Sequence, residues 1–150
     1  MDVTSEIVDK VTHQHHGQRA PDEVIAQILS ALNGLKNDSD DIVAAIVTSS
    51  DGLPWAQVLP DNFDVKRFSA MSSAILALSI TMAREAGRGD TKNLMVEADN
   101  GNIYVLQAGP TLLLTVFTKA TTNMGLTLAH TRGAAEQIDQ IKINYDATQS

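Results

Sequence analysis

The residues from Phe68 to Ala83 read FSAMSSAILALSITMA, and this stretch contains no charged side chain. Large apolar residues recur in it every three or four positions, which predicts a long helix. One stripe of this helix is expected to lie on a sheet, and it consists of Phe68, Met71, Ile75, Leu78 and Met82. In that orientation Leu76 and Ile80 would stay exposed, although burying each such side chain is worth roughly 1.5–3 kcal/mol. The stretch therefore predicts that a second surface covers this helix.

A second copy of the same helix, related by a two-fold axis, would supply that cover. Small residues form an adjacent face that would let two helix backbones approach closely, namely Ala70, Ala74, Ala77 and Thr81. The alternative is that the first helix or the N-terminal residues of the same chain cover this surface. The uncharged stretch favours a two-fold dimer, and coverage by another part of the same chain stays an open alternative.

Outward from this helix, the sequence contains further strand-like and helical patterns. Apolar, β-branched runs predict strands over 42–47, 53–59, 92–98, 102–108 and 111–118. Helical spacing occurs over 21–35 and 123–145, and Gly34 is expected to end the first of these helices. Short turns such as Asn100-Gly101 imply hairpins, so we expect an antiparallel, five-stranded sheet.

The order α-β-β-α-β-β-β-α predicts the fold class. Strands 42–47 and 111–118 are apolar on both faces, so helices must cover both sides of the sheet. We therefore expect an α/β (α+β) fold in the form of a three-layer α/β/α sandwich. Residues 21–150 are expected to form a single domain, whereas residues 1–20 show weak periodicity and are expected to be a flexible leader.

Composition and charge exclude several classes of protein. The chain has 150 residues, which suits one domain, and its hydrophobic content of 43% argues against disorder. It contains no cysteine, which removes disulfides, thiolate metal sites and a cysteine nucleophile. A net charge of −7 argues against nucleic-acid partners. The sequence opens on no signal peptide and has no apolar run long enough to insert in a membrane, so we expect a cytoplasmic location.

No pattern of catalytic or cofactor-binding residues stands out. The sequence has neither a glycine-rich phosphate loop with its lysine nor a G-x-S-x-G turn. His13, His15 and His16 are close in sequence, but a histidine cluster alone is a weak indication of a metal site. We expect no enzyme activity, no catalytic residue, no cofactor and no metal.

The joint order of several motifs resembles the Roadblock family, which includes dynein-light-chain-like and MglB-like dimers. The motifs, in chain order, are SSDGLP at 49–54, RFSAMSSAILALS at 67–79, LMVEADNGNIYVLQAG at 94–109 and LLLTVFTKATTNMGL at 112–126. The similarity covers about residues 22–143 and leaves out the leader. None of these motifs is specific alone, because SDG or NG by itself indicates only a turn.

The resemblance implies a profilin-like fold and a dimer in which the second helix and the third strand join two sheets into one. Carried onto this sequence, the implied interface consists of Met71, Ala74, Ile75, Leu76, Ala77, Leu78, Ile80, Ala83, Leu94 and Val96. Many members of the family regulate small Ras-like GTPases, and some stimulate GTP hydrolysis by their partner. None of these roles needs a catalytic group on the Roadblock chain.

Two functions of different kinds follow from the resemblance. The first is a non-enzymatic homodimeric adaptor or regulator that binds a small Ras-like GTPase, with stimulation of GTP hydrolysis left open. The second is a structural scaffold subunit of a signalling or motility complex without direct GTPase contact. Candidate partner contacts are Trp55, Arg67 and Arg84, although core packing explains Trp55 equally well and solvated helix ends explain the two arginines. A third hypothesis is a small-molecule sensor, because a profilin-like sandwich can enclose a ligand.

Overall fold

The computed structural model describes residues 21–120 and 123–149, and the predicted leader with its three histidines lies outside these ranges. The described elements are α2 (Asp22–Asp38), β1 (Ile42–Ser49), β2 (Pro54–Val58), α3 (Val65–Glu85), β3 (Leu94–Ala98), β4 (Gly101–Gln107), β5 (Leu112–Thr118) and α4 (Met124–Gln149). This order confirms the one that the sequence predicts. None of the helices in the described ranges is long and apolar enough to cross a membrane.

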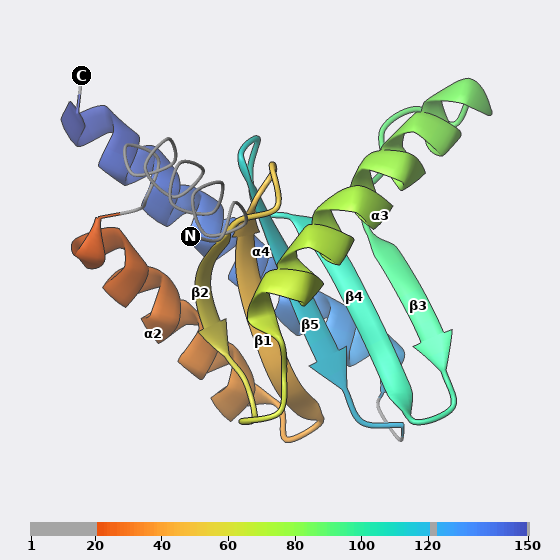
Figure 1. Cartoon of the computed structure of the whole chain (residues 1–150), viewed down its shortest axis with the longest axis horizontal. Coiled ribbons are helices and arrows are strands. Elements are labelled where there is room, and N and C mark those ends of the chain that lie inside the picture. Colours follow the sequence, from red (N-terminus) through yellow and green to blue (C-terminus); the bar gives the residue numbers. More distant parts are fainter. Residues whose placement is uncertain (1–20, 121–122, 150) are drawn as a thin grey trace, which may run out of the picture.

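The strands form one antiparallel sheet in the order β2-β1-β5-β4-β3. Helices α2 and α4 pack together on one face of this sheet, and α3 crosses the other face (Figure 1). The larger core lies on the α2 and α4 side, where Ile28, Leu114 and Ile138 are fully buried. The predicted three-layer sandwich is therefore confirmed, and β2 and β3 form its two edges.

Hydroxyl groups line the contact between α3 and the sheet. Thr48 Oγ1 on β1 donates to Ser69 Oγ at 3.1 Å, and Thr115 Oγ1 on β5 donates to Ser72 Oγ at 2.8 Å. Both serines are buried. Because serine is small and its hydroxyl finds a partner here, α3 can lie close to the strands without leaving a buried polar group unpaired.

The predicted orientation of α3 is wrong except at Phe68, which packs against Phe117 on β5 as expected. Leu76, expected on the outer side, is only 2% exposed and packs with Val105 and Leu113. Met71, Ile75, Leu78 and Met82, expected on the sheet, are instead the exposed large apolar residues of this helix. The physical reason is that Ser69, Ser72 and Leu76 share one face, and the hydroxyl pairs seat this face on β1 and β5.

The first helix also differs from its prediction. Gly34 does not end α2, which continues to Asp38, and a methyl group on Gly34 would meet no atom within 4 Å. The helix continues because Leu35, one residue further, is 3% exposed and belongs to the core. Burial of Leu35 outweighs the low helix propensity of one glycine, which costs about 1 kcal/mol.

Tyr104 on β4 carries a buried hydroxyl group that has no hydrogen-bond partner among residues 21–120 and 123–149. The residue is 1% exposed and belongs to the core beneath α2 and α4. An unpaired buried hydroxyl costs about 1–3 kcal/mol, whereas the phenyl ring of phenylalanine fills nearly the same space. We therefore expect Tyr104→Phe to raise the free energy of unfolding by about 1 kcal/mol. Urea denaturation at a fixed protein concentration measures this change, and a clear loss of stability would contradict the expectation.

Candidate functional site

The outward side of α3 exposes large apolar residues in an unbroken row. Leu78 is 61% exposed and Met82 is 63% exposed, and Ile75 and Met71 lie about one and two turns before Leu78. We call these four residues the outer face of α3. Single exposed apolar residues are common on soluble domains, but a contiguous set of them indicates an interaction surface. The α3 residues 68–83 contain no charge that would solvate this face.

An apolar groove of about 440 Å³ lies between α3 and the β3 side of the sheet. Its walls come from α3, β3, β4 and β5, and they consist of Phe68, Met71, Ser72, Ala74, Ile75, Leu78, Val96, Ile103, Val105, Thr115 and Phe117. Leu78 and Met71 thus belong both to the outer face and to the groove. The helix is therefore not packed against the strands along its whole width on this side, and large apolar side chains from another molecule would fit here.

The two edge strands of the sheet differ in how they are protected against pairing. In β2, Pro54 lacks a backbone N–H, and the register with β1 shifts between Val47 and Thr48. Proline and bulges are the usual devices that prevent an edge from pairing with another chain. In contrast, β3 (LMVEA) contains no proline, pairs with β4 in unbroken register, and carries one charge, Glu97. This open edge lies at the opposite side of the sheet from β2 (Figure 1), and its residue Val96 lines the groove.

Most residues of the predicted interface lie around this groove. Five of them are exposed or line it from α3, namely Met71, Ala74, Ile75, Ala77 and Leu78. Four others are half-buried, namely Ile80 and Ala83 on α3 and Leu94 and Val96 on β3. Leu76 is the exception, because it is buried inside the same chain and is not accessible to another molecule. We therefore remove Leu76 from the candidate interface.

The three predicted partner contacts do not come together. Trp55 on β2 is half-buried and packs against the core on the α2 side of the sheet, opposite α3. Arg67 is exposed in the first turn of α3, where its backbone N–H donates to Asp64 Oδ1 at 3.2 Å. Arg84 is in the last turn of the same helix and forms an ion pair with Asp90. These residues share no surface, and their role as partner contacts stays a prediction.

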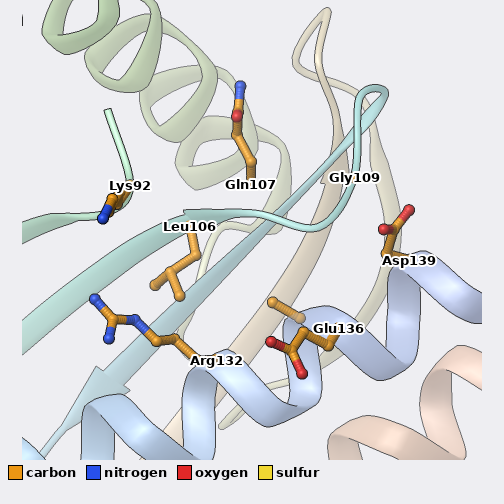
Figure 2. A pocket seen from close by; sticks show the side chains of 8 residues that line it. Lys92, Leu106, Gln107, Gly109, Arg132, Glu136 and Asp139 are labelled. Carbon is orange, nitrogen blue, oxygen red and sulfur yellow. The ribbon is translucent and has the colours of Figure 1, made fainter. Parts of the chain in front are cut away.

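A second, polar hollow lies between α4 and the end of β4, and no sequence pattern predicts it. Its volume is about 170 Å³, and Lys92, Arg132, Glu136 and Asp139 surround it (Figure 2). Arg132 donates to Asn93 Oδ1 at 2.9 Å. Binding pockets for small molecules usually measure roughly 300–1,000 Å³, so this hollow is small for a ligand. Within the described ranges no group of acidic or histidine side chains is arranged to hold a metal ion.

Comparison with known proteins gives a family for this chain. The family model described as "Roadblock/LC7 domain" matches residues 28–118. The uncharacterised protein MJ1340 of Methanocaldococcus jannaschii is 33% identical over 102 residues, which make up 68% of this chain and 89% of that protein. Residues 28–118, which match the family model, include α3, the groove and the edge strand β3.

Solved structures show the same fold at low identity. The gliding protein MglB from Thermus thermophilus superposes with a TM-score of 0.75 and 16% identity, covering 82% of this chain and 93% of that one. Profilin II from Acanthamoeba castellanii gives a TM-score of 0.53 and 12% identity, covering 69% and 90%. The second likeness confirms the profilin-like fold class that the sequence predicts.

Proposed function

Since this chain belongs to the Roadblock/LC7 domain family, we propose that it is a non-enzymatic homodimeric adaptor that binds a small Ras-like GTPase. The main support for a dimer is that the exposed apolar outer face of α3 lies beside the open edge strand β3. A solved structure of MglB is described as having a tetrameric arrangement, which supports self-association in this group of proteins. The GTPase partner is supported by the family resemblance.

In the proposed dimer, a two-fold axis normal to the sheet sets β3 antiparallel to the β3 strand of the second copy. Both copies of α3 then lie side by side on the same face of one continuous sheet. The outer face of each helix enters the groove of the other chain, so the apolar residues exposed in one chain become buried. Burial of these residues provides the driving force for association.

The pairing register follows from the two faces of β3. Opposed residues of antiparallel strands lie on the same face, so the axis must pass through a residue of β3 rather than between two residues. An axis at Glu97 would place two carboxylates opposite each other, which is unfavourable. An axis at Val96, the middle residue of β3, avoids this and pairs the full length of the strand. We therefore place the axis at Val96.

Because the chain contains no cysteine, a single introduced cysteine tests this register directly. Opposed residues of paired strands have Cα atoms about 4.5–5.5 Å apart, a separation at which disulfides form. Val96→Cys is expected to yield a covalent dimer under mild oxidation, visible on a non-reducing gel. Gln57→Cys, exposed on the opposite edge strand β2, is the matched control and should stay monomeric on the gel. Equal cross-linking of both variants would contradict the proposed pairing.

The GTPase partner is tested by titrating the purified chain with a Ras-like GTPase encoded in the same genome. Calorimetry is done with the GTPase loaded either with a non-hydrolysable GTP analogue or with GDP. Tighter binding to one nucleotide state supports the adaptor function, and the rate of GTP hydrolysis with and without the chain shows whether it also regulates. A dimeric chain that binds no Ras-like GTPase in either state would overturn this part of the proposal in favour of a structural scaffold.

A further inference from the structure

The connection between α3 and β3 folds back along the end of α3. The helix ends where Gly87 adopts a φ of 70°, and the Arg88 N–H donates to the Ala83 carbonyl at 2.8 Å. This is the usual left-handed helix end, which only glycine adopts at little cost. The chain therefore reverses direction directly after the helix and leads into β3 beside it.

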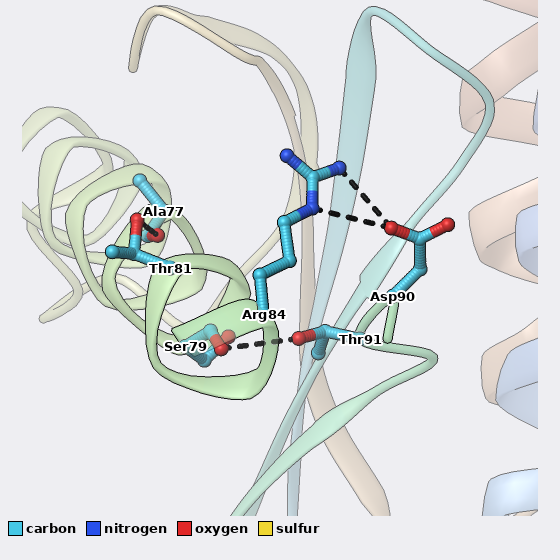
Figure 3. A network of polar contacts seen from close by, with 6 residues as sticks. All are labelled: Ala77, Ser79, Thr81, Arg84, Asp90 and Thr91. Atoms are coloured by element: carbon cyan, nitrogen blue, oxygen red, sulfur yellow. Dashed lines mark hydrogen bonds and ion pairs between the residues drawn. The ribbon is translucent and has the colours of Figure 1, made fainter. Parts of the chain in front are cut away.

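Two side-chain contacts tie this connection to the last turns of α3. Thr91 Oγ1 donates to the Ser79 carbonyl at 3.1 Å, and Arg84 Nε and Nη2 both donate to Asp90 Oδ1, at 3.2 and 3.1 Å (Figure 3). The Arg84 and Asp90 side chains are 65% and 85% exposed. Because water surrounds this ion pair, it contributes little to stability. Thr91 is half-buried, so its hydrogen bond is the better shielded of the two contacts.

Within the part of the chain that the structure describes, the C-terminal part of α3 has few other contacts that fix its position. Leu76 is the last fully buried residue of the helix, and Ile80, one turn later, is half-buried. The C-terminal turns of the helix extend past the ends of the neighbouring strands (Figure 1). Thr91 stands three residues before the first residue of β3 and contacts the carbonyl next to Ile80. Its hydrogen bond thus joins the free end of α3 to the open edge strand.

We propose that Thr91 is a positioning residue for self-association. By binding the Ser79 carbonyl, Thr91 holds the outer face of α3 at a fixed separation from β3, so both parts of the interface meet the second copy together. This inference rests on the proposed dimer. A surface that is already arranged before binding loses less conformational freedom on association, which strengthens the complex.

Thr91→Val tests this role, because valine keeps the shape of threonine and lacks the hydroxyl donor. We expect the dissociation constant of the dimer, measured by sedimentation, to rise about three- to tenfold, because the ordering that this hydrogen bond supplies before binding would then have to occur on association. Thr91→Ser retains the donor and should restore the wild-type constant. The matched control is Thr111→Val, an exposed threonine in the β4–β5 turn, and it should leave the constant unchanged.

A second measurement separates positioning from a loss of stability. In a chain kept monomeric by Leu78→Glu, Thr91→Val is expected to speed hydrogen exchange of the β3 amides while leaving the exchange of β1 unchanged. An unchanged dissociation constant in Thr91→Val, or a failure of Thr91→Ser to restore it, would overturn the positioning role alone. A wild-type chain that stays monomeric at every concentration would instead overturn the proposed dimer.

Discussion

Leu78→Glu is expected to convert the dimer into a folded monomer. Leu78 is 61% exposed in the single chain, so a glutamate there would be solvated and would not disturb the fold. In the dimer the same carboxylate would be buried against the apolar groove without a partner. An uncompensated buried charge costs about 3–5 kcal/mol, so the dissociation constant should rise at least about a hundredfold. Sedimentation equilibrium distinguishes a mass of 16.1 kDa from twice that value.

Leu126→Glu is the matched control for this experiment. Leu126 is 57% exposed, close to the value for Leu78, but it lies in the first turn of α4 on the other side of the sheet. The control variant should remain dimeric, and circular dichroism should show that both variants are folded. If Leu78→Glu kept the wild-type mass, the outer face of α3 would not be the interface.

Gly101→Ala is expected to cause the largest loss of stability among single-methyl substitutions in the described chain. Gly101 begins β4 after the hairpin turn and has a φ of 142°, a conformation that side chains rarely adopt. A methyl group on this glycine would lie directly against the Thr118 carbonyl at the end of β5. Since that atom is backbone, the strands must shift, and the free energy of unfolding should fall by about 3 kcal/mol.

The same substitution at Gly34 provides a control of opposite sign. Gly34 lies inside α2 with open space around it, so alanine there should stabilise the helix by about 0.5–1 kcal/mol. Both variants are compared by urea denaturation at one protein concentration, because dimerisation makes stability depend on concentration. Similar stabilities for Gly101→Ala and the wild type would show that the hairpin tolerates a side chain.

The fold could be predicted from the sequence because its signals are local. Apolar runs such as 42–47 and 112–118, separated by short turns, indicate strands and hairpins wherever they occur. The uncharged stretch from Phe68 to Ala83 likewise predicts a long helix, which is present as α3, whereas the second surface expected to cover this helix stays a prediction. Element order and layers follow from such patterns, and these predictions are confirmed.

The orientation of α3 could not be predicted, because it depends on contacts between distant residues. The spacing of large apolar residues favours the stripe through Met71 and Leu78 as the side that meets the sheet. The opposite result follows from threonines on β1 and β5, whose hydroxyls pair with Ser69 and Ser72. The polar hollow is a similar case, since Lys92 and Arg132 come from segments far apart in the chain.

The choice of variants depends on the orientation of α3, as Leu76→Glu illustrates. The sequence alone would suggest it as a probe of the dimer interface. Because Leu76 is buried between α3 and the sheet, the substitution is expected to unfold the chain rather than to separate two folded copies.

The unequal edges of the sheet limit how far assembly can proceed. If two copies pair through β3, each copy uses the one edge of the described sheet that is free of proline and register shifts. The outer borders of the joined sheet are then two copies of β2, whose proline and shifted register resist the addition of a further strand. Strand pairing in this protein would therefore be self-terminating, and it would yield a closed pair instead of a growing fibre.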